Sequence, residues 1–166
     1  YISNNSGASF TKITDPNIGS VGSMSASDDG SVILVVDQNR FNPCNSGVYI
    51  SQNSGTSFSQ INYGLPTQCG SGYWVEAVGV SGDGGTLVAT SYGKTMVSRD
   101  ATASWNQSTI PAGETGGGGR LAISQDGSRI ALMRYYNSPL TSDDFGATFK
   151  ARNTFAVAAT SEWAAI

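Results

Sequence analysis

The 166-residue sequence contains no histidine. The chain alone therefore cannot build a histidine-ligated metal site, a Ser-His-Asp triad or an imidazole general base. Charged residues make up only 13% of the sequence, about half of the usual share, and the formal net charge is −3. No run of Lys or Arg marks a nucleic-acid interface, and no apolar stretch approaches the ~20 residues of a membrane-spanning helix.

Glycine is abundant instead, with 21 residues, and serine, threonine and asparagine are frequent. Helix bundles and coiled coils need Ala, Glu, Lys and Leu, so this composition argues against both. It favours short β-strands joined by tight turns, because glycine and asparagine adopt turn conformations at little cost. The length suffices for one domain with its own core, or for a piece of a larger one.

An eight-residue pattern recurs four times, and we call each copy an octet. Its consensus is Ser-x-Asp/Asn-x-Gly-x-Ser/Thr-aromatic. Successive octets begin 48, 47 and 44 residues apart, which indicates an internal repeat. The octets are residues 3–10, 51–58, 98–105 and 142–149.

A second pattern alternates with the octets: an apolar run, a serine, an Asp-Gly pair and another apolar run. Asp-Gly between two strand-like runs is a strong hairpin signal, because glycine accepts a positive φ without steric cost. The pairs are Asp29-Gly30, Asp83-Gly84 and Asp126-Gly127.

Each repeat therefore predicts four antiparallel strands, A to D. In the second full unit they are expected at 74–80, 86–90, 95–98 and 104–109. A ~40–50-residue period of such strands is typical of a β-propeller blade, so we predict an all-β propeller. Each octet then forms a C–D turn, where its Asp or Asn accepts hydrogen bonds from backbone N–H groups. Its closing aromatic is expected to point into the core; the predicted core aromatics are Phe10, Phe58, Trp74, Trp105, Phe149 and Trp163.

The octet resembles the Asp-box, or BNR repeat, of sialidases, xyloglucanase-type glycosidases, sortilin-type receptors and many extracellular repeat proteins. The resemblance covers essentially the whole chain and implies a β-propeller. Asn replaces Asp at Asn5 and Asn53, and Thr102 replaces Gly, which favours a structural staple over a ligand site. The residues assigned to this staple are Ser3, Asn5, Gly7, Phe10, Ser51, Asn53, Gly55, Phe58, Ser98, Asp100, Trp105, Ser142, Asp144, Gly146 and Phe149.

We expect one β-propeller segment over residues 1–166. Its parts are the end of a blade (1–19), three blades (20–62, 73–110 and 119–152) and the start of the next (162–166). Two interpretations of these incomplete blades stay open. We favour a partial ring, a fragment of a larger propeller, because a four-bladed ring lacking one B strand would leave unpaired edge groups.

Two cysteines, Cys44 and Cys69, fall in B–C and D–A loops, which emerge at the same end of a four-stranded meander. We expect a disulfide between them, worth ~3 kcal/mol from loop entropy, with two free thiols as the alternative. Asn4 and Asn106 begin Asn-x-Ser sequons, and Asn106 is the better glycosylation candidate because it should face solvent. Together with the resemblance, these features favour an extracellular or secreted glycoprotein.

No residue pattern marks a catalytic site. Sialidases bind a carboxylate with three converging arginines, but only Arg40 and Arg134 fall clearly in B–C loops. A glycosidase needs two carboxylates, and most of the 12 acidic residues belong to turn motifs. Asp37 and Glu76 are left as stray candidates. The paired aspartates lack the alternating spacing of a calcium loop, so we predict no metal and no cofactor.

Aromatic residues and arginines gather in the B–C and D–A loops, where they suit a protein interface or sugar stacking, unless the tyrosines only pad strand edges. We therefore predict a non-enzymatic extracellular scaffold, structural or adhesive, that presents this loop face to partner proteins, glycans or the rest of its own propeller. The alternative is a segment of a sialidase- or xyloglucanase-like glycoside hydrolase, or a carbohydrate-binding propeller. The loop-face residues are Arg40, Phe41, Tyr63, Tyr73, Tyr92, Arg134, Tyr135 and Tyr136.

Overall fold

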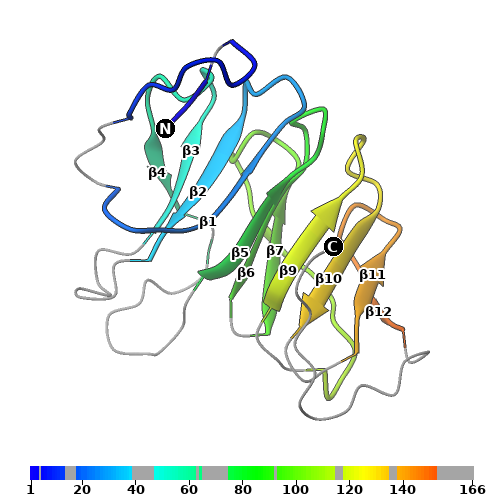
Figure 1. Cartoon of the computed structure of the whole chain (residues 1–166). Helices are drawn as coiled ribbons and strands as arrows, with labels where there is room; N and C mark the ends of the chain where they lie inside the picture. Colours follow the sequence, from blue (N-terminus) through cyan, green and yellow to red (C-terminus); the bar gives the residue numbers. More distant parts are fainter. Residues whose placement is uncertain are drawn as a thin grey trace.

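The computed structural model describes residues 1–3, 5–13, 18–38, 47–62, 64, 75–91, 93–114, 118–134 and 138–152. These residues form twelve β-strands and no helix. The strands make three four-stranded antiparallel sheets, which stand side by side in Figure 1. The prediction of an all-β chain is confirmed.

Consecutive strands pair within each sheet, so every sheet is a meander. The first sheet contains β1 (Val21–Ala26), β2 (Ile33–Asp37), β3 (Gly47–Ser51) and β4 (Ser59–Ile61). The second contains β5 (Val75–Val80), β6 (Leu87–Ser91), β7 (Lys94–Ser98) and β8 (Asn106–Gln107). The third contains β9 (Gly118–Ile123), β10 (Ile130–Arg134), β11 (Leu140–Ser142) and β12 (Lys150–Ala151).

The two sequence patterns form the turns of these meanders. Each Asp-Gly pair joins the first two strands of a sheet, and the octets 51–58, 98–105 and 142–149 join the last two. Both kinds of turn lie at the same end of the sheets, the upper end in Figure 1. The repeat therefore places its serine- and aspartate-rich segments on one edge of the molecule.

Two apolar cores fill the spaces between the three sheets, and the middle sheet contributes to both. Alternate residues of a strand point to opposite faces. Leu87 and Ala89 of β6 accordingly join the core shared with the first sheet, and Val88 joins the core shared with the third. Burial on both faces explains why β6 begins with three successive apolar residues instead of an alternating pattern.

The innermost strands β1, β5 and β9 follow one another across these cores. Gly79 of β5 faces Leu121 and Ile123 of β9, and a Cβ at this position would overlap both side chains. Between β1 and β5, the Ser25 hydroxyl accepts a hydrogen bond from Val80 N at 3.0 Å. Small residues on the inner strands thus allow the close approach of the next sheet.

Backbone hydrogen bonds join neighbouring sheets at their turns. Asp28 N donates to Gly82 O at 2.9 Å, and Asp83 N donates to Gln125 O at 2.8 Å. On the outer side, Thr109 forms a parallel bridge with Thr148 of the last octet. The three sheets are therefore held together by polar contacts at the turn end as well as by their apolar cores.

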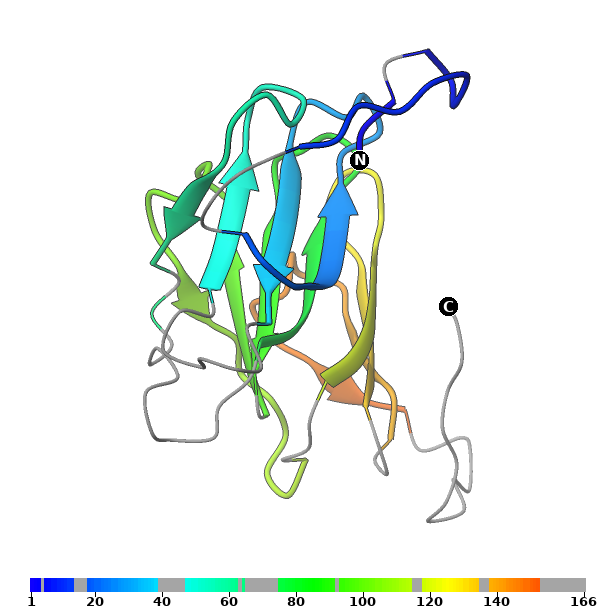
Figure 2. The same cartoon turned by 60° about the vertical axis from the view of Figure 1, so that its left-hand side comes forward.

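The N-terminal segment takes the place of the outer strands of a preceding sheet. Ile2 and Thr11 exchange two backbone hydrogen bonds, of 2.9 and 2.8 Å, in an antiparallel bridge. Ile2 packs against Gly55 as Val97 packs against Gly146 two repeats later. Figure 2 shows this segment beside the turn end of the first sheet. Residues 162–166, expected to start a further blade, lie outside the described residues, as do Trp74 and Trp163.

The aromatic residues that close the octets differ in burial. Phe149 is 4% exposed in the second core, and Trp105 packs against the first core. Phe58 is half-buried beside Ile2. Phe10 is 62% exposed, so the prediction that it packs inward is wrong. An octet aromatic packs against the sheet that precedes its own, and no described residue fills that place beside Phe10.

Candidate functional site

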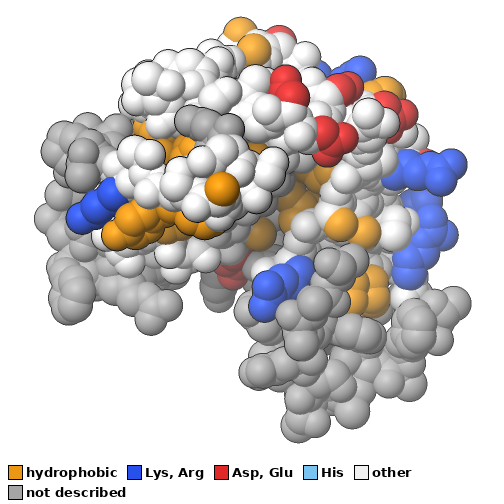
Figure 3. All heavy atoms as spheres, turned by 45° about the horizontal axis from the view of Figure 1, so that its top comes forward, with side chains coloured by type: hydrophobic (Ala, Val, Ile, Leu, Met, Phe, Trp, Pro, Cys, Tyr) orange, Lys and Arg blue, Asp and Glu red, His pale blue; other side chains and the backbone are white. Residues whose placement is uncertain are grey.

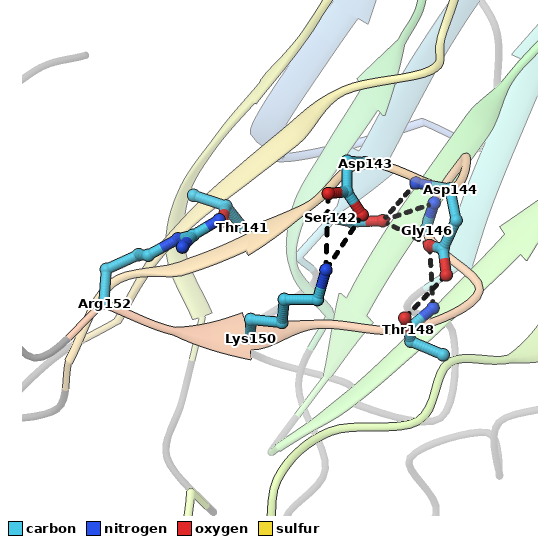
Figure 4. Close-up of polar contacts among 8 residues, drawn as sticks. All are labelled: Thr141, Ser142, Asp143, Asp144, Gly146, Thr148, Lys150 and Arg152. Atoms are coloured by element: carbon cyan, nitrogen blue, oxygen red, sulfur yellow. Dashed lines mark hydrogen bonds and ion pairs between the residues drawn. The ribbon is translucent and has the colours of Figure 1, made fainter.

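Each octet is a corner closed by its own hydrogen bonds, which Figure 4 shows for residues 142–149. The Ser142 hydroxyl donates to Asp144 Oδ1 at 2.7 Å and accepts from Gly146 N at 2.9 Å. Asp144 Oδ1 also accepts from Thr148 N at 2.9 Å, and its Oδ2 accepts from the Thr148 hydroxyl at 2.6 Å. The serine-to-Oδ1 bond measures 2.9 Å in each of the other three octets. The expectation that Asp or Asn accepts backbone hydrogen bonds within the turn is confirmed.

Two consecutive residues of each octet have left-handed backbone conformations. The second of them is glycine in three octets and Thr102, at φ 79°, in the third. The first is Ser6, Ser54 or Ala101 in three octets, but Phe145, at φ 59°, in the last. Left-handed backbone costs a residue with a side chain ~1–2 kcal/mol, so every octet holds at least one residue against a steric penalty.

The Asp-Gly turns form a second kind of staple. In each, a serine hydroxyl donates to the aspartate Oδ1, at 2.7, 2.6 and 2.7 Å. The backbone N–H two residues after the aspartate donates to the same oxygen, at 2.9, 2.8 and 3.0 Å. Figure 3 shows acidic side chains gathered at this end of the molecule. The serine–aspartate pairs are Ser27–Asp29, Ser81–Asp83 and Ser124–Asp126.

These hydrogen bonds favour the ionised carboxylates and lower their pKa values. The Ser31 backbone N–H is the main cause at Asp29, whose pKa falls to about 2. A hydroxyl donor is the main cause at the other four: Ser81 for the lowered pKa of Asp83, Ser104 for that of Asp100, Ser124 for Asp126 and Thr148 for Asp144. The pKa falls to about 2 at Asp126 and Asp144. A glycosidase needs one carboxylic acid of raised pKa, so none of these five suits that role.

The two stray carboxylates do not form an open catalytic pair. Asp37, at the end of β2, is 1% exposed, and its Oδ1 accepts a hydrogen bond from Ser20 N at 2.6 Å. Glu76 is half-buried in β5. Because Asp37 is enclosed and occupied by a backbone donor, it cannot reach a substrate in this conformation.

The loop-face prediction can be followed at one residue, Arg134. This arginine ends β10 and is 2% exposed. Its guanidinium donates to the carboxylate and the backbone carbonyl of Glu114. The contact links β10 to the segment before β9. Arg134 therefore stabilises the fold and is not exposed on a binding surface, as had been predicted. The other loop-face residues and the cysteines lie outside the described residues: Arg40, Phe41, Tyr63, Tyr73, Tyr92, Tyr135, Tyr136, Cys44 and Cys69.

Of the two sequons, Asn4 also lies outside the described residues, and Asn106 is exposed on β8. Across the described ranges, no three metal-ligating side chains come together. Nor does this part of the chain contain a helix long and apolar enough to cross a bilayer.

A groove of about 320 Å³ opens at the outer side, between β8 of the second sheet and the last octet. We call it the rim groove. Its lining includes Arg99 and Phe145, and the Arg99 guanidinium carbon lies 3.8 Å from the centre of the Phe145 ring. Ser108, which is 6% exposed, also lines it, and its hydroxyl has no hydrogen-bond partner among the described residues. Arg99 lies in the octet 98–105, which was expected to form only a turn. The sequence signal that distinguishes this groove is the aromatic Phe145, at a position that holds Ser or Ala in the other octets.

The same place two repeats earlier also holds a groove, of about 330 Å³, between residues 1–13 and the octet 51–58. There Ser54 stands in the position of Phe145, and Ile13 in that of Ser108. The inter-sheet groove is therefore a feature of the repeat, whereas the aromatic ring, the stacked guanidinium and the buried hydroxyl belong to the rim groove.

Four-stranded meanders that follow one another with their first strands innermost are the blades of a β-propeller. The described residues form three such blades. The fold is shared with YCF48 from Cyanidioschyzon merolae (13% identity, TM-score 0.64) over 85% of this chain and 42% of that one. It is also shared with YCF48 bound to D1 peptide (16%, 0.62; 84% and 42%) and with a GH74 enzyme from Niastella koreensis (19%, 0.60; 91% and 20%).

No model of a known protein family and no curated protein matches the sequence. The chain spans less than half the length of the propeller proteins that it resembles. At these identities the likeness establishes the fold, and function has to be argued from the residues.

Proposed function

We propose that this chain is a non-enzymatic scaffold, built from Asp-box repeats, that serves a structural or adhesive role outside the cell. The observation that carries the proposal is the use of its carboxylates. The five aspartates of the turns accept hydrogen bonds within their own turns and have lowered pKa values. Two further acids, Asp143 and Glu114, pair with Lys150 and Arg134. These seven acids all take part in contacts that hold the fold, which argues against a catalytic role for any of them.

Presentation of a surface to partner proteins or glycans fits the repeat architecture. Blades supply a rigid framework, and loops on such frameworks carry recognition. One of the similar propellers is described as bound to a D1 peptide. The proposed partners are therefore proteins, glycans or further blades of the same propeller, with the loop face at the end opposite the octets as the principal surface.

The extracellular setting rests on the two cysteines, the sequons and the low charge of the sequence. Titration of thiols in the denatured protein tests the disulfide: we expect no free thiol before reduction and two after it. Peptide mass spectrometry after expression through a eukaryotic secretory pathway tests Asn106, with Asn106→Gln as the control. Two free thiols in the secreted protein would contradict the expected disulfide.

The competing function is part of a glycoside hydrolase, which the likeness to GH74 enzymes favours. Incubation of the chain with xyloglucan and sialyllactose, followed by chromatography of the products, separates the two. We expect no released sugar. If sugar is released, and if Asp37→Asn or Glu76→Gln abolishes that release, the chain is part of a glycosidase and the scaffold function is wrong.

A further inference from the structure

Three features that the fold does not require meet in the rim groove. Phe145 places an aromatic ring at an octet position that holds Ser or Ala in the other three copies, with the same left-handed backbone. The Arg99 guanidinium stacks on the Phe145 ring and has no hydrogen bond or ion pair with another described residue. The Ser108 hydroxyl is buried and unpaired within the same described set. Unpaired polar groups cost stability, and the convergence of two of them with an aromatic ring in one groove indicates a binding site.

The equivalent groove beside residues 1–13 provides an internal comparison. It has nearly the same volume but lacks the aromatic ring and the buried hydroxyl, since Ser54 and Ile13 stand in their places. The fold can therefore close this corner without Phe145, and its presence calls for another explanation than packing.

The charges in the rim groove restrict what can bind there. Asp100 and Asp144 line the groove with Arg99, and their lowered pKa values keep both carboxylates ionised at neutral pH. Two negative charges beside one positive charge disfavour a simple anion. A suitable ligand must accept hydrogen bonds from a guanidinium and donate to carboxylates over a short distance.

Neighbouring hydroxyl groups meet this requirement, because each hydroxyl both donates and accepts. The exposed amide of Gln107 adds a further donor and acceptor to the wall. The volume lies at the lower end of the ~300–1,000 Å³ found for small-molecule sites. We propose that the rim groove binds a neutral saccharide through Arg99, Ser108 and the carboxylates of Asp100 and Asp144, with one sugar ring beside Phe145.

This inference deepens the proposed scaffold and rests on it, since it makes a glycan one of the bound partners. The site lies at the outer side of two blades, away from the loop face. The guanidinium is already fixed on the Phe145 ring, so less side-chain freedom is lost on binding.

The test is an NMR titration of the ¹⁵N-labelled 166-residue chain with cellotetraose, xylotetraose and mannotetraose, and separately with inorganic phosphate and a lysine-rich peptide. We expect at least one tetrasaccharide to shift the amides of residues 99–108 and 144–147. Arg99→Ala, Ser108→Ala and Phe145→Ser should each weaken that binding by about tenfold or more.

Phe145→Ser is the sharpest variant, because it installs the residue found at this position in the first two octets, where serine adopts the same left-handed backbone. It should therefore keep the fold of this corner. Lys12→Gln, in the equivalent groove, is the matched control and should leave the affinity unchanged.

Saccharide binding that the three variants leave intact would overturn the inference, and so would shifts caused by phosphate or the peptide alone. If no tetrasaccharide binds, the rim groove is not a saccharide site, but the proposed scaffold function is not contradicted. Cleavage of a tetrasaccharide, detected by chromatography of the same samples, would overturn the non-enzymatic role instead.

Discussion

The two N-terminal octets use asparagine and the two C-terminal octets use aspartate, yet the four corners have the same shape. In all four, the side-chain Oδ1 accepts from the same backbone N–H, at 2.9, 3.0, 2.9 and 2.9 Å. The second side-chain atom differs: Asn53 Nδ2 donates to Ser57 Oγ at 2.9 Å, whereas Asp144 Oδ2 accepts from Thr148 Oγ1. A hydroxyl can take either role.

The comparison shows which parts of the corner fix its shape. One acceptor oxygen and two left-handed residues are common to all four octets. The negative charge is present in two of them and makes those corners sensitive to pH. Variants that exchange these parts between octets separate backbone geometry from charge.

The largest effect is expected where the left-handed glycine is also crowded. A Cβ on Gly146 would lie 2.8 Å from Val97 Cγ2 and 2.9 Å from Ile130 Cδ1. Gly146→Ala should lower the free energy of unfolding by about 3 kcal/mol, through backbone strain and overpacking, in urea denaturation. Gly7→Ala is the control, because no atom lies within 4 Å of its Cβ, and should cost about 1 kcal/mol or less. Equal losses in both variants would refute the part played by crowding.

A gain in stability is expected from a substitution in the third octet, where a threonine occupies the position of the left-handed glycine. Thr102→Gly should raise the free energy of unfolding by about 0.5–1 kcal/mol, because relief of left-handed strain exceeds the added freedom of the unfolded chain. Ala103→Gly, one residue later, gains no such relief and should lower it. If Thr102→Gly lowers the free energy of unfolding, the threonine side chain stabilises the folded protein by more than its left-handed backbone destabilises it.

The charge difference predicts a difference in acid stability. The pKa of Asp144 is lowered from 3.8 to about 2 in the folded protein. Its stabilising contribution is therefore complete above pH 3.8 and is lost as the pH falls toward 2. Asp144→Asn should keep the corner at neutral pH, as Asn53 does, and flatten the fall of the melting temperature over this range. Asn53→Asp should steepen it, and circular dichroism melts across this pH range measure both.

An unchanged acid profile in both variants would contradict the assignment of acid sensitivity to the octets. The aspartates of the Asp-Gly turns remain in Asp144→Asn, so part of the acid dependence should persist.

The smallest change in stability is expected at Ser57, an exposed serine of the octet 51–58. Ser57→Ala removes the acceptor of Asn53 Nδ2 but keeps the backbone bond of residue 57, and water can replace the lost partner. The expected change in unfolding free energy is below about 0.5 kcal/mol. Ser51→Ala should cost about 1–2 kcal/mol, since the Ser51 hydroxyl is buried and serves both Asn53 and Gly55 N. Equal costs would contradict this ranking of the two serines.

Local sequence determined most of the fold. The octets and the Asp-Gly pairs are complete hydrogen-bonding units, so their positions predicted the turns, and the apolar runs between them predicted the strands. The candidate site was harder to predict from the sequence. Arg134 was expected on a binding surface and pairs with Glu114 in the interior, because a partner 20 residues away in the chain leaves no mark in the local pattern.

The sequence by itself determined the blade: its period, its two staples and its antiparallel order follow from interactions within about eight residues. Only the tertiary structure decided what lies between blades. Phe10 is exposed and Phe149 buried although both close an octet, since burial depends on the neighbouring sheet. The rim groove likewise joins Arg99 and Ser108 to Phe145 of the next repeat, a contact that arises only when two blades pack together.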